Sequence, residues 1–364
     1  MENTSGRTNP NRKNIIKAAA LIAIIIAASV IYNSCGFGGG SLKNIYSTEV
    51  GANYRMSDSD GGVIIVNYDG AKLISENGEV RSSVENRMSS PHVSTSGGYM
   101  LMYDKDGYNV ALYRDMKKVY LYECDRIVKN ARVNKNGYAV LVSDETGYNA
   151  RITVLTPKGK VEYIWKIGDV YVVDADISPD NQRLAVAAIS TDTGVIVETL
   201  IFADTYKEQE LARATAEGSV PLRVKFTNSG GVITVSDDKL SSYSSSGEQK
   251  WSVPFESRLL KSFDIEDSGN TVLALSGIKN NTIIQTYTKG GAKSGEYTTE
   301  SEVKSIDAKG KYIAVFEPSK ISVITFSGKL AEEYKTQKDF KEMLMLGRKK
   351  ILLLGTDGID LLRY

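Results

Sequence analysis

The chain has 364 residues, 41% of them hydrophobic, with 32 Gly, 21 Tyr and 7 Pro. This composition suits one large all-β domain or two ordinary domains, because it can bury a core and is rich in turn formers and strand-forming aromatics. The formal net charge is +1, and residues 1–17 contribute +3 of it, which leaves −2 for the remainder. Nucleic acid is therefore not expected as a partner, since its binding draws on concentrated Lys and Arg.

The first 42 residues predict a membrane anchor. A basic segment, 1–13, precedes an apolar run that includes "AAALIAIIIAASVIY". A helix over 14–32 would measure roughly 28 Å, close to the hydrocarbon thickness of a bilayer. Positive charge precedes this helix, so the positive-inside rule predicts a cytoplasmic N-terminus and an exported remainder. Residues 33–42 contain "GFGGGS", which is typical of a flexible linker.

Two other interpretations of this segment stay open. "AAS" at 27–29 could serve as a signal-peptide cleavage site, and Cys35 could carry a lipid. All three place the following domain outside the cytoplasmic membrane. Cys35 and Cys124 are too few for a disulfide framework and match no zinc pattern.

A repeat of about forty residues fills the rest of the chain. Its unit is a polar turn followed by an apolar strand, as in "SDGGVIIV", "SGGYMLMY", "KNGYAVLV", "PDNQRLAV", "SGGVITV", "SGNTVLAL", "KGKYIAV" and "GRKKILLL". Strand-like segments flank each copy, and four strands per repeat predict one propeller blade. We predict an all-β propeller of eight four-stranded blades, or of seven if the irregular first copy is not a blade.

The ends of the predicted propeller domain, 43–364, are expected to meet. The last repeat has residues for three of its four strands only. The segment "KNIYSTEV", 43–50, precedes the first blade and is strand-like, so we expect it to supply the missing strand and close the ring.

Two stretches, "DKDGYN" from 104 and "DETGYN" from 144, could suggest calcium loops. An EF-hand requires oxygen ligands at alternate positions and Gly at the sixth, where Asn109 stands in the first stretch. The two stretches occupy equivalent places in consecutive repeats, so we interpret them as hairpin turns between second and third strands.

Three segments carry a resemblance to known propellers. "DISPDNQRLAV", 176–186, resembles the S-P-D-G-x-x-L-A signature of WD40-like and TolB-type repeats, with Asn181 in place of Gly. "TPKGKVEYIW" and "SSSGEQKW" are similar to tryptophan-docking motifs of quinoprotein-type eight-bladed propellers. Taken whole, the chain resembles an uncharacterised family of membrane-anchored propellers of Gram-positive bacteria, a domain of unknown function. The resemblance implies an architecture and no activity.

No catalytic, cofactor-binding or metal-binding residues are predicted. The single histidine, His92, has no partner identifiable by spacing, and no nucleophile elbow accompanies it. Charged residues are expected on the first strands, which line the channel of a propeller. A quinoprotein-like or sugar-processing enzyme could use the carboxylates, but the cations favour internal ion pairing. These residues are Asp174, Asp176, Asp264, Glu266, Arg132, Arg223, Lys225, Lys261 and Lys304.

These observations favour a membrane-anchored scaffold or binding module at the cell envelope. The expected partner is an envelope protein or a cell-wall glycan, and no cofactor is expected. Two charged segments, 204–218 and 331–343, are candidates for an extended loop or edge and for a short helix or exposed connection, respectively. The oligomeric state does not follow from the sequence.

Overall fold

A computed structural model describes residues 40–49, 54–59, 62–191, 194–207, 209–278, 281–347 and 349–364. The regular elements in these ranges are all β-strands. No helix within these ranges is long and apolar enough to cross a membrane. The predicted basic segment, the predicted membrane helix and nearly all of the predicted linker, Cys35 included, lie outside the described residues.

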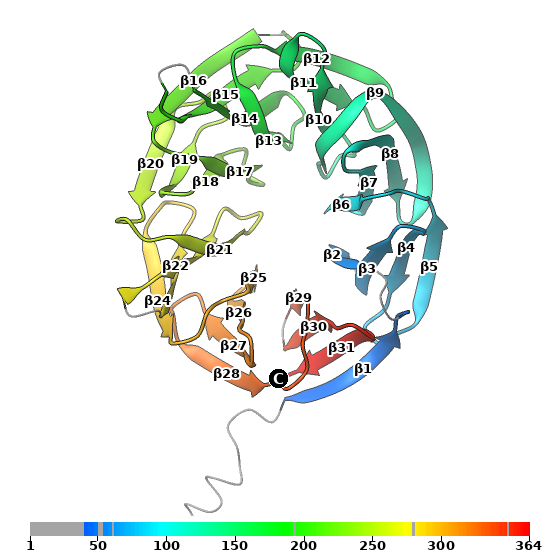
Figure 1. The fold of residues 1–364 in the computed structure, drawn as a ribbon, viewed down its shortest axis with the longest axis vertical. Helices are drawn as coiled ribbons and strands as arrows, with labels where there is room; N and C mark the ends of the chain where they lie inside the picture. Colours follow the sequence, from blue (N-terminus) through cyan, green and yellow to red (C-terminus); the bar gives the residue numbers. More distant parts are fainter. Residues whose placement is uncertain are drawn as a thin grey trace, which may run out of the picture.

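The strands form antiparallel sheets arranged radially around a centre, which defines a β-propeller (Figure 1). Five sheets contain four strands consecutive in sequence, ordered from the centre outward. Their strands are β2 (Arg55–Ser59), β3 (Gly62–Asn67), β4 (Gly70–Ile74) and β5 (Val80–Glu85); β13 (Tyr171–Ile177), β14 (Arg183–Ser190), β15 (Val197–Asp204) and β16 (Gln209–Glu217); β17 (Pro221–Phe226), β18 (Val232–Ser236), β19 (Lys239–Tyr243) and β20 (Gln249–Pro254); β21 (Leu260–Ile265), β22 (Thr271–Ser276), β23 (Thr282–Tyr287) and β24 (Lys293–Thr299); and β25 (Ser305–Lys309), β26 (Tyr312–Phe316), β27 (Lys320–Thr325) and β28 (Leu330–Lys335).

One sheet has seven strands because a single long strand belongs to two four-stranded arrays. Its strands are β6 (Pro91–Ser96), β7 (Tyr99–Asp104), β8 (Gly107–Arg114), β9 (Lys117–Val133), β10 (Ala139–Glu145), β11 (Tyr148–Leu155) and β12 (Val161–Ile167). The first part of β9 pairs with β8 at the rim, and its last part pairs with β10 at the centre. The repeat predicted two separate strands here, whereas the backbone continues without a break.

The last sheet joins the two ends of the described chain. It contains β29 (Glu342–Gly347), β30 (Lys350–Leu354) and β31 (Gly358–Arg363), with β1 (Ser41–Ser47) as its outermost strand. Strand β1 pairs antiparallel with β31, so that Ser41 faces Arg363 and Ser47 faces Gly358. The strand begins two residues earlier than the expected segment 43–50 and ends three residues earlier.

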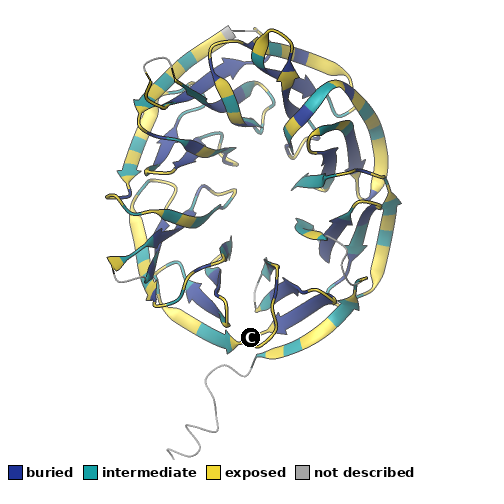
Figure 2. Cartoon of the chain, viewed as in Figure 1, coloured by how far each residue is buried: buried dark blue, intermediate teal, exposed yellow. Residues whose placement is uncertain are grey.

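Burial follows strand position within each sheet. The second strands are buried along nearly their whole length, as in β18, because both faces of the sheet pack against neighbouring sheets. The outermost strands β5 and β20 alternate between exposed and half-buried residues, since only their inner side meets a neighbour (Figure 2). This position explains why middle strands have continuous apolar runs and outer strands alternate.

The core is divided among the interfaces between sheets. Eight hydrophobic clusters occur within the described residues, and each combines two neighbouring sheets or the two halves of the seven-stranded sheet. One of them joins Val63 and Ile65 of β3 to Leu352 and Leu354 of β30, across the point where the chain ends meet. The ring is therefore closed by apolar packing as well as by the pairing of β1.

Two predicted turn motifs have clear structural roles. The "DKDGYN" and "DETGYN" stretches form the β7–β8 and β10–β11 hairpins, which confirms the turn interpretation. Asn181 stands at a position with φ of 66°. It therefore takes the place of the Gly in the WD40-like signature, because Asn tolerates the left-handed conformation better than most residues do.

The two charged segments, 204–218 and 331–343, are mostly strand. Residues 209–217 of the first segment form β16, the outermost strand of its sheet. In the second segment, 331–335 belongs to β28 and 342–343 to β29, and the residues between them form a connection. The short helix offered as one alternative is wrong, because residues 336–341 form an irregular connection. Phe340 in this connection is buried in the core between the two sheets.

Glycines in the turns between third and fourth strands let neighbouring sheets approach closely. Gly291 has φ of 82°, and a Cβ atom there would lie 2.6 Å from the Trp251 ring of the preceding sheet. The indole Nε1 of Trp251 donates a hydrogen bond to the Lys289 carbonyl at 3.2 Å. The Trp of the "SSSGEQKW" segment therefore packs against a turn of the next sheet.

The substitution Gly291→Ala should therefore destabilise the fold. Alanine at this positive φ costs about 1–3 kcal/mol, and its methyl group would clash with Trp251. Gly290→Ala is the matched control, because a Cβ at Gly290 meets only Thr288 Oγ1, at 3.8 Å. Chemical denaturation should give a lower free energy of unfolding for Gly291→Ala alone; equal values for both variants would contradict the packing argument.

Candidate functional site

The innermost strand of each sheet has one edge without a neighbouring strand. The backbone N–H groups along this edge need acceptors, because buried donors without partners are costly. Side chains from the preceding sheet in the ring supply many of them. The carboxylate acceptors and their donors are Asp174 with Val224 N (3.0 Å), Asp176 with Phe226 N (2.7 Å), Asp264 with Ala308 N (2.8 Å), Glu266 with Gly310 N (2.8 Å), Asp307 with Met345 N (2.5 Å) and Glu342 with Met56 N (2.7 Å).

Asp174 is the most heavily bonded of these carboxylates. It is buried, and it accepts hydrogen bonds from the Arg132 guanidinium at 3.0 and 3.1 Å and from Asn130 Nδ2 at 2.7 Å. Arg223 adds an ion pair at 3.7 Å. Three inner strands, β9, β13 and β17, therefore converge on one carboxylate, and the mixed charges of this part of the channel are internally paired.

Burial changes the proton affinity of several channel carboxyls. It raises the pKa of Asp176 to about 6, although the nearby Arg132 charge opposes the change. Burial, together with the charge of Asp264, raises the pKa of Asp307 to about 7. The pKa values of Asp264 and Glu342 are raised for the same primary reason, burial.

Hollows in the channel are polar. One of about 420 Å³ is lined by His92, Asn130, Arg132 and Arg223, among others. Burial lowers the pKa of His92, whose Nδ1 lies 3.0 Å from the Ser90 carbonyl oxygen. Within the part of the chain that the structure describes, no three His, Cys, Asp or Glu side chains gather as a metal site requires. The polar groups here act mainly on one another.

The other residues expected in the channel lie on or next to innermost strands. Lys225 donates to the Ile265 carbonyl at 2.6 Å and pairs with Asp267 at 2.8 Å. Lys261 lies on β21 and is exposed. Two residues expected on first strands lie one residue outside them: Lys304 precedes β25 and Glu266 follows β21. The Lys304 N–H still bonds to the Phe316 carbonyl of β26, and its ammonium pairs with Asp339 of another connection. Because the length of the repeat varies from copy to copy, the sequence pattern could not fix where a strand begins or ends to within one residue.

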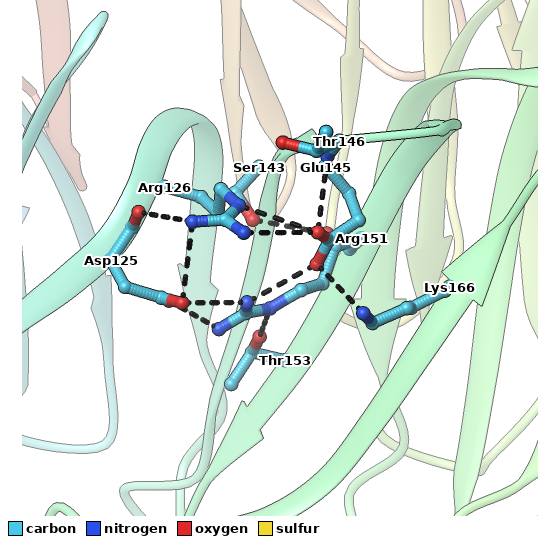
Figure 3. Close-up of polar contacts among 8 residues, drawn as sticks. All are labelled: Asp125, Arg126, Ser143, Glu145, Thr146, Arg151, Thr153 and Lys166. Carbon is cyan, nitrogen blue, oxygen red and sulfur yellow. Dashed lines mark hydrogen bonds and ion pairs between the residues drawn. The ribbon is translucent and has the colours of Figure 1, made fainter.

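A buried ionic network holds the bend of β9 (Figure 3). Glu145 accepts hydrogen bonds from Arg126 and Arg151, each at 3.3 Å, and Arg151 also reaches Asp125 at 2.6 Å. Burial alone would raise the pKa of Glu145, but the Arg151 hydrogen bond and the charges of Lys166 and Arg126 lower it below its ordinary value. The network fixes the point where one strand passes between two arrays.

The loops of the ring lie on two opposite faces. In radially arranged antiparallel sheets, turns between first and second strands and between third and fourth strands share one face, here named the turn face. Turns between second and third strands share the other face with the connections between sheets, and we name it the connection face. The Figure 3 network, at the end of β10 and the bend of β9, lies on the connection face.

Exposed apolar residues concentrate on the connection face. The described residues include eighteen large hydrophobic side chains that are exposed. Seven lie on outermost strands, and only Tyr206 lies on the turn face. Val173 and Leu222 lie on innermost strands and line the channel hollow. The remaining eight belong to the connection face: Tyr68, Tyr108, Tyr148, Tyr171, Val195, Ile196, Leu259 and Ile278.

Two of these residues form the most exposed apolar pair. Leu259 is 66% exposed and Ile278 is 82% exposed. They are held near each other because Leu259 and Ser276 exchange hydrogen bonds at 2.8 Å. Sequence reasoning missed this surface, since each residue is isolated in sequence and only the ring brings the loops to one side.

Comparisons with solved structures agree with the propeller class. The C-terminal WD40 domain of Sif2 matches with a TM-score of 0.65 over 89% of this chain and 98% of that one, at 11% identity. BamB from Moraxella catarrhalis gives 0.56 over 89% and 100%, also at 11% identity. Sqt1 from Chaetomium thermophilum, bound to the N-terminus of ribosomal protein L10, gives 0.57 over 90% and 98%, at 11% identity. At such identities the likeness concerns the fold alone.

The sequence itself identifies a family. The family of unknown function DUF5711 matches residues 39–363. The chain therefore belongs to this family, which spans nearly all of the described propeller. No curated protein matches the sequence.

The raised pKa of Asp307 predicts a pH-dependent stability. The folded state binds this proton more tightly than the unfolded chain, whose aspartates titrate near pH 4, so Asp307 should reduce stability as pH rises from about 4 to 7. Asp307→Asn keeps an acceptor for Met345 N and removes the charge. Thermal midpoints measured from pH 4 to 8 should fall less with pH in this variant.

The exposed Asp357 provides the control. Asp357→Asn should leave the pH profile of the parent protein unchanged. An unaltered profile in Asp307→Asn would show that this carboxyl does not carry the dependence.

Proposed function

We propose that this protein is a membrane-anchored, extracytoplasmic propeller of eight blades that binds a protein partner through its connection face. The observation that carries the proposal is the gathering of eight exposed apolar side chains on that face. Apolar surface exposed on one side of a rigid domain is a usual mark of a protein-binding surface.

The count of eight blades is supported by β9 and by the core. If β9 counts once in each of its two arrays, the described strands form eight sets of four. The eight hydrophobic clusters then correspond to the eight interfaces of a closed ring. The alternative of seven blades would leave one such interface unassigned.

The orientation of the domain is supported by strand β1. Ser41 faces Arg363, the last residue of a third strand, so the chain enters the ring from the turn face. A membrane helix over 14–32 would then lie on the turn-face side. The connection face would point away from the membrane, where a partner can reach it.

The chemistry of the connection face indicates the kind of partner. On this face, eight exposed carboxylates make no ion pair, against five exposed Lys and Arg side chains that make none. A partner with an apolar patch rimmed by Lys or Arg would be complementary. Sqt1, a protein of similar fold, is bound to the N-terminus of the ribosomal protein L10 in its solved structure.

Substitution of the most exposed apolar pair should abolish partner binding. In the double variant Leu259→Asp/Ile278→Asp, two charges enter the proposed contact without disturbing the core, because both side chains are exposed. Crosslinking in intact cells followed by mass spectrometry should recover a partner with the parent protein and lose it with this variant.

Tyr206→Asp is the matched control, since Tyr206 is 59% exposed but lies on the turn face. It should keep the partner. Loss of the partner in Tyr206→Asp with retention in Leu259→Asp/Ile278→Asp would place the contact on the wrong face and contradict the proposal.

Membrane anchoring has a direct biochemical test. The full chain should stay with the membrane fraction after extraction at high pH, because an inserted helix resists alkali whereas peripheral contacts do not. A chain lacking residues 1–39 keeps β1 and should be released into the soluble fraction. Extraction of the full chain under the same conditions would refute the anchor.

A further inference from the structure

Unpaired positive charge is concentrated on the turn face. Among the described residues, eighteen exposed Lys and Arg side chains make no ion pair, and twelve of them lie within two residues of a turn on this face. These are Arg81, Lys117, Lys118, Lys135, Lys158, Lys160, Lys207, Lys289, Lys311, Lys329, Lys349 and Arg363. They come from turns all around the ring, so they form a broad surface and not a local pocket.

Unpaired negative charge has the opposite distribution. Eleven exposed carboxylates in the described ranges make no ion pair, and only Glu79, Glu162 and Asp180 lie near the turn face. The other eight lie on the connection face: Glu49, Glu85, Glu123, Glu217, Asp237, Glu300, Glu302 and Asp357. Five unpaired cations share that face: Arg55, Lys105, Lys261, Lys335 and Lys341. The eighteenth, Lys43, lies on the outermost strand β1.

The net charge of the protein conceals this separation. The whole chain carries a formal net charge of only +1, a value that gives no sign of how the exposed charges are distributed. The turn face carries twelve unpaired cations and three unpaired carboxylates, whereas the connection face carries five unpaired cations and eight unpaired carboxylates. Such a charge dipole along the ring axis orients a protein in an electric field or against a charged surface.

The basic face is also the face by which the chain enters the ring. Strand β1 starts at Ser41 opposite Arg363, and a Cβ at Gly40 would lie 3.1 Å from the Arg363 carbonyl oxygen. Residues 33–39 separate this point from the end of the predicted membrane helix. So short a linker keeps the turn face within a few tens of ångströms of the bilayer, at about 3.5 Å per extended residue.

We propose that the turn face rests on the anionic headgroups of the membrane that anchors the chain. The inference rests on the proposed anchoring for its geometry and on the charge distribution for its chemistry. Lysines that project from turns can reach phosphate groups at a flat surface simultaneously, and each adds attraction within about a Debye length of that surface. The contact would hold the connection face outward.

The test uses the full chain reconstituted into two kinds of vesicle, one of phosphatidylcholine and one of phosphatidylcholine with phosphatidylglycerol. Exposed lysines are acetylated with a membrane-impermeant reagent, and each site is quantified by mass spectrometry. We expect Lys117, Lys158, Lys289 and Lys329 to react several-fold more slowly in the anionic vesicles. Lys105, Lys261 and Lys341 of the connection face serve as internal controls and should react equally in both.

Salt and charge reversal make the test specific. At 1 M salt, where the Debye length is about 3 Å, the protection should disappear. The variant Lys158→Glu/Lys289→Glu/Lys329→Glu should lose the protection of Lys117, whereas Lys105→Glu/Lys261→Glu/Lys341→Glu should keep it. All six side chains are exposed, so both variants should fold.

Two results would overturn the inference: equal reaction of the turn-face lysines in both vesicles, or protection confined to the connection face. Failure of the anchor is a separate outcome, detected when alkali releases the reconstituted chain. In that case, sedimentation of the protein with anionic vesicles but not with phosphatidylcholine vesicles would still support the contact, and sedimentation with neither would refute it.

Discussion

The unpaired inner edge of every sheet is the constraint on which this structure depends. A radial sheet must end at the centre of the ring, and the backbone donors of its last strand have no strand beyond them. Here carboxylates of the preceding sheet accept those donors, as Asp264 does for Ala308 and Glu342 does for Met56. These contacts link each sheet to the next at the centre, while apolar clusters link them further out.

This use of the carboxylates determines what the channel can do. Asp174 and Asp176 could have been a cation site or a pair for acid–base chemistry. The structure engages them with Val224 N and Phe226 N, and Asp174 also with Arg132. Side chains committed to the backbone and to one another are poor ligands for anything else. We therefore place the proposed binding surfaces on the two faces of the ring.

Much of the architecture could be predicted from the sequence because it is local. A strand and its turn are specified by nearby residues, so the hairpins around Gly107 and Gly147 and the strand before the first sheet followed from pattern alone. The predicted strand bounds differed from the structure by one residue at Lys304 and at Glu266. The prediction also separated the two parts of β9, because the bend is stabilised by the distant Glu145 and Arg151, which no local pattern indicates.

The sequence by itself determined the strands, the repeat, the turn types and the absence of a net charge large enough to suggest a polyanionic partner. Only the tertiary structure decided which exposed residues share a face. Leu259 and Ile278 are nineteen positions apart, and Lys117 and Lys329 are separated by more than half of the chain. Radial packing of antiparallel sheets brings alternate turns to opposite sides of the ring, and this geometry sorts apolar and acidic loops from basic ones.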